Sequence, residues 1–376
     1  MKKIAILGAS DFQNPIILKA KEMGLETHVF AWKCNDIGEK TADVFHPISI
    51  ADKEKILEVC QNEKINGITT CASDFAVVAQ NFVADKMGLP GNSISSTLCC
   101  TNKYAMRKKL KSANIPVPFF FKTSLEEELP KDIHNICFPA IVKPTDRSGS
   151  RAIAKVNNID ELKIAIKEAC SLSFSNEAIV EEYINGPEYS CESITKDGIH
   201  HTLALTKKYT TGAPHFIETG HIQPSDIPVD LQPKVIAQIH KALDALEIKN
   251  SASHAEFRLQ PDGSIRIIEI GARMGGDCIG SDLTMLSTGI DFLKNTILVA
   301  LGCKLDLSPK HPIQRAEIKF IMNKNDLINF NMIKNKSLLY KVSNFNLENI
   351  KNISDSSTRI GYYIIVDNHE IQANID

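Results

Sequence analysis

The sequence predicts a protein of mixed α/β and α+β class: an N-terminal doubly wound parallel-sheet domain, a larger central domain and a small C-terminal α+β domain. Strands and helices alternate over the first hundred residues, whereas a β-hairpin with a charged face stands out near residue 260. At 376 residues the chain exceeds the usual size of a single hydrophobic core. We therefore expect three domains, which cover residues 1–100, 101–302 and 303–376.

Short apolar runs alternate with amphipathic stretches in the N-terminal domain, which indicates a mostly parallel sheet. The first strand ends at Gly8, but the G-x-G-x-x-G spacing of dinucleotide-binding folds is absent and no acidic residue ends the second strand, so NAD binding is not expected. Strands are expected at 4–7, 26–31 and 67–70, and helices at 15–23, 53–61 and 75–87. Four polar residues follow strand ends, where they either face a ligand or cap a helix: Ser10, Asp11, Ser73 and Asp74.

The hairpin is the most informative stretch. Polar and apolar residues alternate over 254–259 and 265–270 around a turn that contains Asp and Gly. Because side chains two apart share a face of a strand, His254, Glu256 and Arg258 project together, and Glu269 can meet Glu256 from the partner strand. Two facing carboxylates repel unless one is protonated or a cation lies between them, and Mg²⁺ suits such a site. The alternative is a surface hairpin whose carboxylates face each other by chance.

Upstream segments add a second group of polar features. Residues 138–144 predict a buried strand that ends in Lys143, and the small-residue loop at 145–151 offers backbone N–H groups for an anion. Residues 178–184 predict another strand, which stops at Gly-Pro just before Glu188. Four features follow one another along the chain: a strand that ends in lysine, a small-residue loop, a Glu-Glu-Tyr-Ile strand and a hairpin with paired glutamates. In this order they resemble the ATP-grasp superfamily, and the resemblance covers about residues 101–302.

The resemblance implies ATP as cofactor, Mg²⁺ or alternatively Mn²⁺ as metal, and a role for individual residues. Many members carry Asn two residues after the second Glu, where this chain has Gly271, so a third protein ligand to the metal is not expected from that position. The implied roles are these: Lys103 and Lys143 for the phosphates; Ser148, Gly149 and Ser150 for a loop that closes over them; Glu181, Glu182, Tyr183 and Ile184 for the adenine hinge; Glu188 for the ribose; Glu256 and Glu269 for the metal; and Arg273, with Lys143 and Glu269, for catalysis.

Substrate choice is assigned to residues 214–221. Glu218 and His221 flank Gly220, so we expect a loop, in which a carboxylate suits a substrate ammonium and a histidine suits a carboxylate or polar group. The run resembles the substrate loop of bacterial L-amino-acid ligases and related carboxylate–amine ligases, and Arg258 is added as a third substrate contact. The alternative is a pair of solvated loop residues. His254 is interpreted as a structural neighbour of Glu256.

Composition sets limits on the partners. A formal net charge of −2 gives no reason to expect nucleic acid or an acidic membrane, and the apolar run at 4–7 is too short for a signal peptide. Ten cysteines without metal or framework spacing indicate reduced thiols. From Cys303 the chain becomes rich in Asn and Lys, with one late strand expected at 362–366. We expect a cytoplasmic protein with small-molecule partners; the oligomeric state is open, a homodimer included.

These features together favour an ATP-dependent ligase that joins a carboxylate to an amine through an acyl phosphate, with an amino acid among its substrates. Phosphoryl transfer needs mainly positioning and charge neutralisation, which lysines, a metal and an arginine supply. Two alternatives stay open. One is an ATP-grasp carboxylase that phosphorylates bicarbonate to carboxyphosphate, and the other is a non-catalytic ATP-binding protein.

Overall fold

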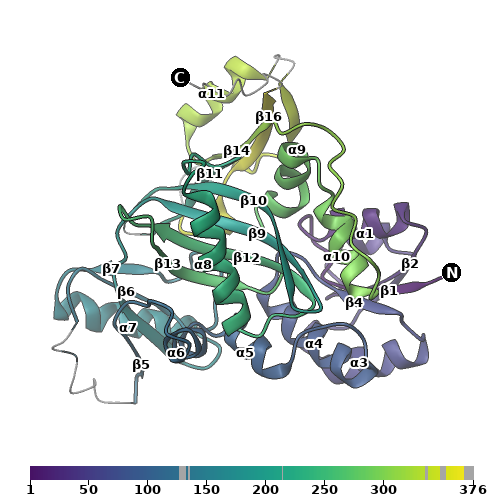
Figure 1. Cartoon of the computed structure of the whole chain (residues 1–376), viewed down its shortest axis with the longest axis horizontal. Coiled ribbons are helices and arrows are strands. Elements are labelled where there is room, and N and C mark those ends of the chain that lie inside the picture. The colour runs from purple at the N-terminus through teal and green to yellow at the C-terminus, as the bar shows by residue number, and fades with distance from the viewer. Residues whose placement is uncertain (127–132, 134–135, 214, 335–337, 348–352, 368–376) are drawn as a thin grey trace.

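The computed structural model describes the chain except for residues 127–132, 134–135, 214, 335–337, 348–352 and 368–376. Three β-sheets lie within the described part (Figure 1). None of the described helices is both long and apolar enough to cross a membrane.

The N-terminal domain is the predicted doubly wound sheet, with strand order β3-β2-β1-β4 and all neighbours parallel. Alternate residues of β1 bury on opposite faces: Ile4 and Ile6 in one core, Ala5 and Leu7 in another. The predicted strands and helices are confirmed, and short α2 and β3 are additional. The elements are β1 (Lys3–Leu7), α1 (Asn14–Glu22), β2 (Glu26–Phe30), α2 (Ile37–Thr41), β3 (Val44–His46), α3 (Lys53–Asn62), β4 (Gly67–Thr69) and α4 (Asp74–Met87).

Two helices then lead into a second, antiparallel sheet with strand order β5-β8-β6-β7. Helix α7 packs on this sheet, and its N-cap is Asn158, whose side chain accepts a hydrogen bond of 2.9 Å from the Glu161 N–H. The apolar pattern of residues 160–170 predicts Asp160 as the cap, which is wrong because the helix begins at Ile159 and includes Asp160 in its first turn. The elements are α5 (Ile94–Thr101), α6 (Lys103–Ser112), β5 (Phe120–Ser124), β6 (Ala140–Pro144), β7 (Ala154–Val156), α7 (Ile159–Leu172) and β8 (Glu177–Glu182).

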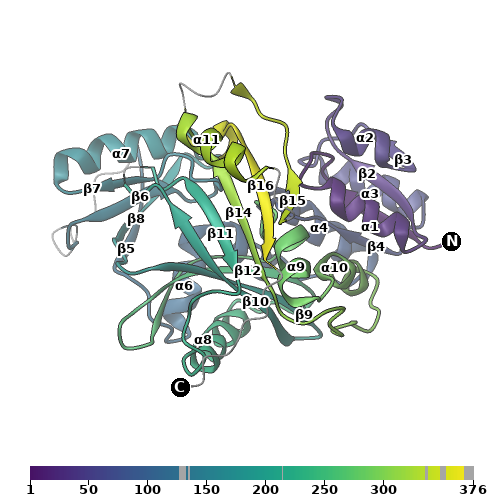
Figure 2. The same cartoon turned by 90° about the horizontal axis from the view of Figure 1, so that it is seen from above.

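An eight-stranded antiparallel sheet forms the rest, in the order β13-β12-β9-β10-β11-β14-β16-β15. The C-terminal segment is α+β, as expected, and its strands continue this sheet beyond β11 instead of forming a sheet of their own (Figure 2). The strands are β9 (Glu188–Lys196), β10 (Ile199–Thr210), β11 (Glu218–Gln223), β12 (Ser251–Leu259), β13 (Ile265–Gly271), β14 (Arg315–Ile321), β15 (Leu339–Val342) and β16 (Gly361–Asp367). The α-helices are α8 (Gln232–Ala245), α9 (Thr284–Thr288), α10 (Phe292–Ala300) and α11 (Lys324–Ile333). In addition, η2 (Ile279–Leu283) is a short π-helix and η4 (Ser356–Thr358) is a short 3₁₀ helix.

The two faces of this large sheet differ in chemistry. Helix α8 lies across one face (Figure 1), where Tyr189, Cys191 and Phe257 join an apolar core with Val235 and Ile239 of the helix. Alternate residues of the same strands carry charge and point to the other face. The polar face therefore lies away from the apolar core, where it can line a cleft.

Candidate active site

A cleft of about 1060 Å³, partly open to solvent, lies between the second sheet and the polar face of the large sheet. All of the residues predicted to bind nucleotide, phosphate or metal line it, from Lys103 on α6 to Arg273 beyond β13. These residues are far apart in the chain, and they come together because they lie in or just beyond strands of the two sheets, in the loop at 148–150 or, for Lys103, at the start of α6.

At the centre of the cleft, a buried carboxylate holds two cations. Lys143 Nζ lies 2.7 Å from Glu181 Oε2, and the Arg107 Nε–H donates to the other oxygen of Glu181. Burial alone would raise the pKa of Glu181, but Arg107 and Lys143 outweigh it and hold the pKa at about 2. Burial lowers the pKa of Lys143, against the opposite pull of Glu181. The Glu181 carboxylate is thus engaged with Lys143 and Arg107, and the backbone at Glu182 and Ile184 beside it stays the proposed adenine hinge.

Arg258 lies at this hinge. Its Nη1 group donates to the Tyr183 hydroxyl and to the Ile184 carbonyl, each at 2.7 Å, and Nη2 donates to Glu188 at 3.1 Å. Arg258 was expected among the substrate contacts; it lines this cleft and not the pocket around His221, because it lies near the far end of β12, opposite Glu188 of β9. There it fixes the hinge and the proposed ribose acceptor relative to each other.

The paired carboxylates of the hairpin are confirmed as neighbours, since Glu256 and Glu269 are opposite each other in the ladder between β12 and β13. Each is met by a lysine: Lys103 Nζ lies 2.9 Å from Glu269, and Lys208 Nζ contacts Glu256. Lysine side chains thus offset the repulsion that led us to expect a cation there. The sequence prediction missed Lys208, because nothing local separates it from the neighbouring Lys207 of the same strand.

His254 completes this network as the neighbour of Glu256 that we expected. Its Nε2 lies 3.1 Å from Glu256 and its Nδ1 lies 2.8 Å from the fully buried Glu192. Burial would lower the pKa of His254, but Glu192 and Glu256 outweigh it and raise the pKa to about 9. A cationic imidazolium therefore joins the two carboxylates at neutral pH.

The donor set fits Mg²⁺. Two carboxylates on facing strands supply hard oxygen ligands, and within the described ranges no cluster of three or more His, Cys, Asp or Glu side chains could enclose a metal alone. An ion held by Glu256 and Glu269 would therefore take its other ligands from water and from the phosphates of a nucleotide.

Arg273 is bound by the N-terminal domain. Its Nε and Nη2 groups each donate to Asp74 at 2.8 Å, and Asp74 is the first residue of α4. Ser73 caps that helix, since its side chain accepts from the Ala76 N–H. Of the two roles left open for these residues, Ser73 therefore takes the cap, and Asp74 contacts Arg273, which lines the cleft.

We call this first cleft the nucleotide cleft after its expected ligand, and the loop at 148–151 the phosphate loop. A second pocket of about 880 Å³, partly open to solvent, adjoins the nucleotide cleft and shares the phosphate loop, Glu218, Glu256 and Arg273 with it. We call it the acceptor pocket. All three parts of the chain line it: Phe12 and Ala72 from the N-terminal domain, the central sheet, and Ser356 with Arg359 from the C-terminal segment.

The loop expected around Glu218 and His221 is wrong, since both residues lie in strand β11. Gly220 suggested a loop, but it is needed within the strand because a Cβ there would lie 2.8 Å from the Ile318 carbonyl oxygen of β14. A β-bulge at Tyr209 and Thr210 pairs Lys208 with His221 and Thr210 with Glu218. The bulge therefore brings Glu218 and His221, three residues apart, to the same face as Lys208.

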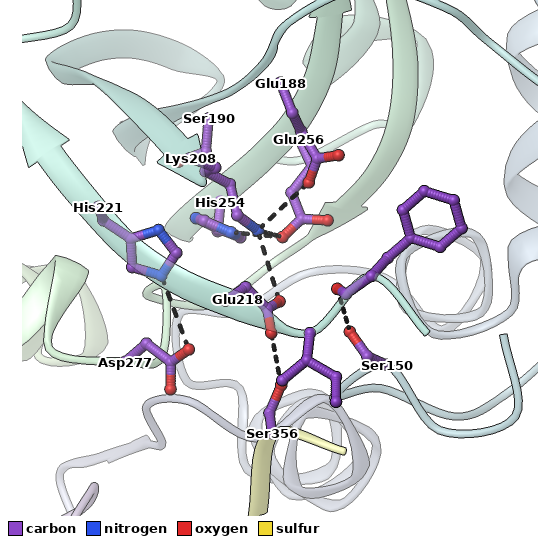
Figure 3. A network of polar contacts seen from close by, with 12 residues as sticks. Ser150, Glu188, Ser190, Lys208, Glu218, His221, His254, Glu256, Asp277 and Ser356 are labelled. Carbon is purple, nitrogen blue, oxygen red and sulfur yellow. Dashed lines mark hydrogen bonds and ion pairs between the residues drawn. The ribbon is translucent and has the colours of Figure 1, made fainter. Parts of the chain in front are cut away.

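These side chains form one network in the acceptor pocket (Figure 3). Glu218 lies 3.9 Å from Lys208 Nζ and accepts a hydrogen bond from the Ser356 hydroxyl. His221 Nε2 lies 3.6 Å from Asp277, and burial lowers the pKa of His221. The pocket thus contains a carboxylate and a neutral imidazole side by side.

Arg359 connects the C-terminal segment that lines this pocket to Asp277. Its guanidinium donates to both oxygens of Asp277, at 2.9 and 2.5 Å, and lies 3.6 Å from the ring centre of Phe320. Neither Ser356 nor Arg359 was predicted, because a residue 138 positions from Glu218 carries no local signal of the contact.

The phosphate loop lies at the boundary of the two pockets. Gly149, Ser150 and Ala152 have φ values of 75°, 58° and 50°, which turn successive N–H groups in unusual directions. The Ser150 hydroxyl donates to the Phe216 carbonyl at 3.2 Å, just before Glu218 (Figure 3). The loop therefore contacts both the nucleotide cleft and the acceptor wall.

Comparison with known proteins agrees with this arrangement. Residues 136–282 match the family model of the ATP-grasp domain, in agreement with the resemblance seen in the sequence. Alanine–anticapsin ligase of Bacillus subtilis is 26% identical over 278 residues, which cover 65% of this chain and 58% of that protein. The chain spans only a little over half the length of the first curated relatives that it matches.

Solved structures show the same fold over almost the whole chain. An L-amino acid ligase of Bacillus licheniformis superposes with a TM-score of 0.80 at 22% identity, over 97% of this chain and 93% of that one. The ADP complex of N5-carboxyaminoimidazole synthetase of Staphylococcus aureus gives 0.76 at 18% identity, over 98% and 93%. At these identities the likeness establishes the fold alone.

Proposed function

We propose that the protein is an ATP-dependent carboxylate–amine ligase that forms an amide bond through an acyl phosphate, with an amino acid as one substrate. The observation that carries this proposal is the pairing of Glu218 and His221 on one face of β11, in a pocket that opens onto the phosphate loop. A carboxylate there can pair with a substrate ammonium beside the site where the phosphoryl group is transferred.

In the first step of the proposed reaction, a substrate carboxylate oxygen attacks the γ-phosphorus of ATP, and the bond to ADP breaks. Lys103, Lys143 and Arg273 line the cleft and would neutralise the charge that spreads over the phosphoryl oxygens. Mg²⁺, held by Glu256 and Glu269, would supply further charge neutralisation when bound.

In the second step, the amine nitrogen attacks the acyl carbon, phosphate leaves with the bonding electron pair, and the nitrogen loses a proton. The boundary position of the phosphate loop, which contacts Phe216 through Ser150, suits a segment that excludes water from the acyl phosphate. The adjoining pockets would let the anhydride meet the amine without leaving the protein.

The lining of the acceptor pocket favours an organic acceptor over bicarbonate. The apolar side chains of Phe12, Ala72 and Ile279 offer contacts that a small hydrophilic anion does not use. The intact set of lysines, carboxylates and arginine in the cleft favours catalysis over simple ATP binding.

A substrate screen tests the proposal. We would measure ADP release with single amino acids, amino-acid pairs, small carboxylates and bicarbonate, and identify the products by mass spectrometry. We expect an amide product and no bicarbonate-dependent turnover. ADP release with bicarbonate alone would select the carboxylase instead, and no ATP turnover with any of these substrates would select the non-catalytic protein.

A matched variant then tests the carrying observation. Glu218→Gln keeps the shape of the side chain and removes its charge, so the KM of the amino acid should rise strongly while ATP affinity stays near normal, since an unpaired ammonium in a desolvated site is costly. An unchanged KM for the identified amino acid would show that Glu218 does not read its ammonium.

A further inference from the structure

The guanidinium of Arg273 is only partly used by the protein. Nε and Nη2 donate to the two oxygens of Asp74 at 2.8 Å each, and Nη1 donates to the Met274 carbonyl at 3.1 Å. A guanidinium has five N–H donors. Within the part of the chain that the structure describes, one N–H on Nη1 and one on Nη2 have no further protein partner, and Arg273 lines both the nucleotide cleft and the acceptor pocket.

Gly271 provides the space in which this pair lies. A Cβ at position 271 would lie 2.8 Å from Asp74 Oδ1 and 3.2 Å from Arg273 Cζ. The first contact is shorter than van der Waals packing allows, so any side chain at 271 must displace Asp74 or Arg273. Gly271 is also the position at which the sequence departs from many ATP-grasp members. The lack of a side chain at position 271 thus leaves the space that the Asp74 carboxylate occupies.

The environment of Asp74 suits a strong, fixed ion pair. Asp74 begins α4, and the positive end of a helix dipole favours a carboxylate in its first turn. The two side chains are only 15% and 13% exposed, so water screens their attraction weakly. A two-point contact with a planar guanidinium fixes its orientation as well as its position.

We infer that Asp74 is a positioning residue for phosphoryl transfer, an inference that rests on the proposed function. It holds the Arg273 guanidinium so that the two remaining N–H groups can meet phosphoryl oxygens, and Gly271 is required to admit its carboxylate. The N-terminal domain thereby acts on a reaction carried out by the central domain.

Substitutions on one helix test the inference. Asp74→Asn keeps the size of the side chain but loses the charge and one of the two acceptors, so kcat should fall roughly 10- to 100-fold through loss of orientation, while the KM for ATP changes less than about threefold. Asp85→Asn, an exposed position on the same helix, is the matched control and should leave kcat within about twofold. Melting temperatures of both variants would show that the fold is retained.

Coupling to Gly271 separates positioning from a merely structural role. Gly271→Ala should lower kcat in the same way, and the Asp74→Asn/Gly271→Ala double variant should be little worse than either single variant, because both changes disrupt one contact. Multiplicative losses in the double variant, or wild-type kcat in Asp74→Asn, would overturn the inference.

A binding measurement makes the result independent of the amide-forming reaction. Asp74→Asn should weaken binding of MgADP with aluminium fluoride, a mimic of the transferring phosphoryl group, about 10-fold or more, and leave MgADP affinity nearly unchanged. Equal affinities of Asp74→Asn and wild type for the fluoride complex would refute the role of Asp74. If the two proteins differ in this way but the wild type makes no amide with any substrate, the proposed function alone is refuted.

Discussion

Replacing Lys208 with methionine removes the cation at the centre of the acceptor network and keeps the length of the side chain. Lys208 is 5% exposed, contacts Glu256, and lies 3.9 Å from both Glu188 and Glu218. Burial opposes its charge, but the three carboxylates outweigh that effect and raise the pKa of the ammonium above its ordinary value. The methionine variant therefore leaves three partly buried carboxylates without their common partner.

The magnitude follows from the contacts that remain. Removing one member of a buried ion pair destabilises a protein by about 3–5 kcal/mol. Here Glu256 keeps His254 at 3.1 Å and Glu188 keeps Arg258 at 3.1 Å, so we expect the lower end, about 3 kcal/mol. Added Mg²⁺ should restore more stability in the variant than in the wild type, because binding to the freed carboxylates is linked to folding.

Urea unfolding of the ligand-free protein at neutral pH measures this effect. Lys207→Met is the matched control: Lys207 is the preceding residue of β10, on the other face, where it pairs with the 63% exposed Asp226 at 3.4 Å and donates to the Tyr189 hydroxyl at 3.0 Å. Such a surface pair is worth about 1 kcal/mol or less. If the two variants lose equal stability, or Lys208→Met loses less than about 1 kcal/mol, the reasoning about the buried network is refuted.

Three further outcomes are expected. Glu269→Gln should cut turnover on the order of 10²-fold or more with little change in folding, since a metal contributes several kcal/mol in phosphoryl transfer; near-wild-type turnover would remove Glu269 from the metal site. Ser356→Ala should raise the KM of the amine substrate several-fold, because the Glu218 carboxylate loses the hydrogen bond that holds it in position. Ser354→Ala is the control, since Ser354 is exposed in the same segment and does not line the pocket, and it should leave this KM unchanged. Arg107 and Lys143 lower the pKa of Glu181 to about 2, so the stabilisation by its carboxylate is complete above pH 4.5 and is lost as the pH falls toward 2. In Glu181→Gln the free energy of unfolding should therefore fall less steeply between pH 4.5 and 2. An unchanged slope in acid unfolding would contradict this expectation.

The nucleotide cleft was largely predictable because its signals are local. The Glu256–Glu269 pairing follows from alternation around a short turn, and Lys143 and Glu188 follow from where strands end. Each of these observations needs fewer than twenty neighbouring residues. The strand periodicity that places a side chain on a face is a property of the segment itself.

The acceptor pocket was not predictable to the same degree because its contacts join distant segments. Asp74 and Arg273 are 199 residues apart, and Ser356 and Glu218 are 138 apart. Gly220 was misinterpreted for the same reason: the carbonyl that requires glycine belongs to β14, which no local pattern places beside β11. The bulge that aligns Glu218 with His221 likewise depends on pairing with β10.

The C-terminal wall of the acceptor pocket has a consequence for how this architecture changes its substrate. The segment that carries Ser356 and Arg359 joins β16 at the far side of the sheet from the hairpin, and it lines the acceptor pocket without lining the nucleotide cleft. Under the proposed function, a short exchange before β16 would reshape the acceptor pocket and leave every lysine and carboxylate of the nucleotide cleft in place. For protein engineering, the residues around Ser356 and Arg359 are therefore the ones to vary in a library that aims to change which acceptor is bound, while the residues of the nucleotide cleft stay unchanged.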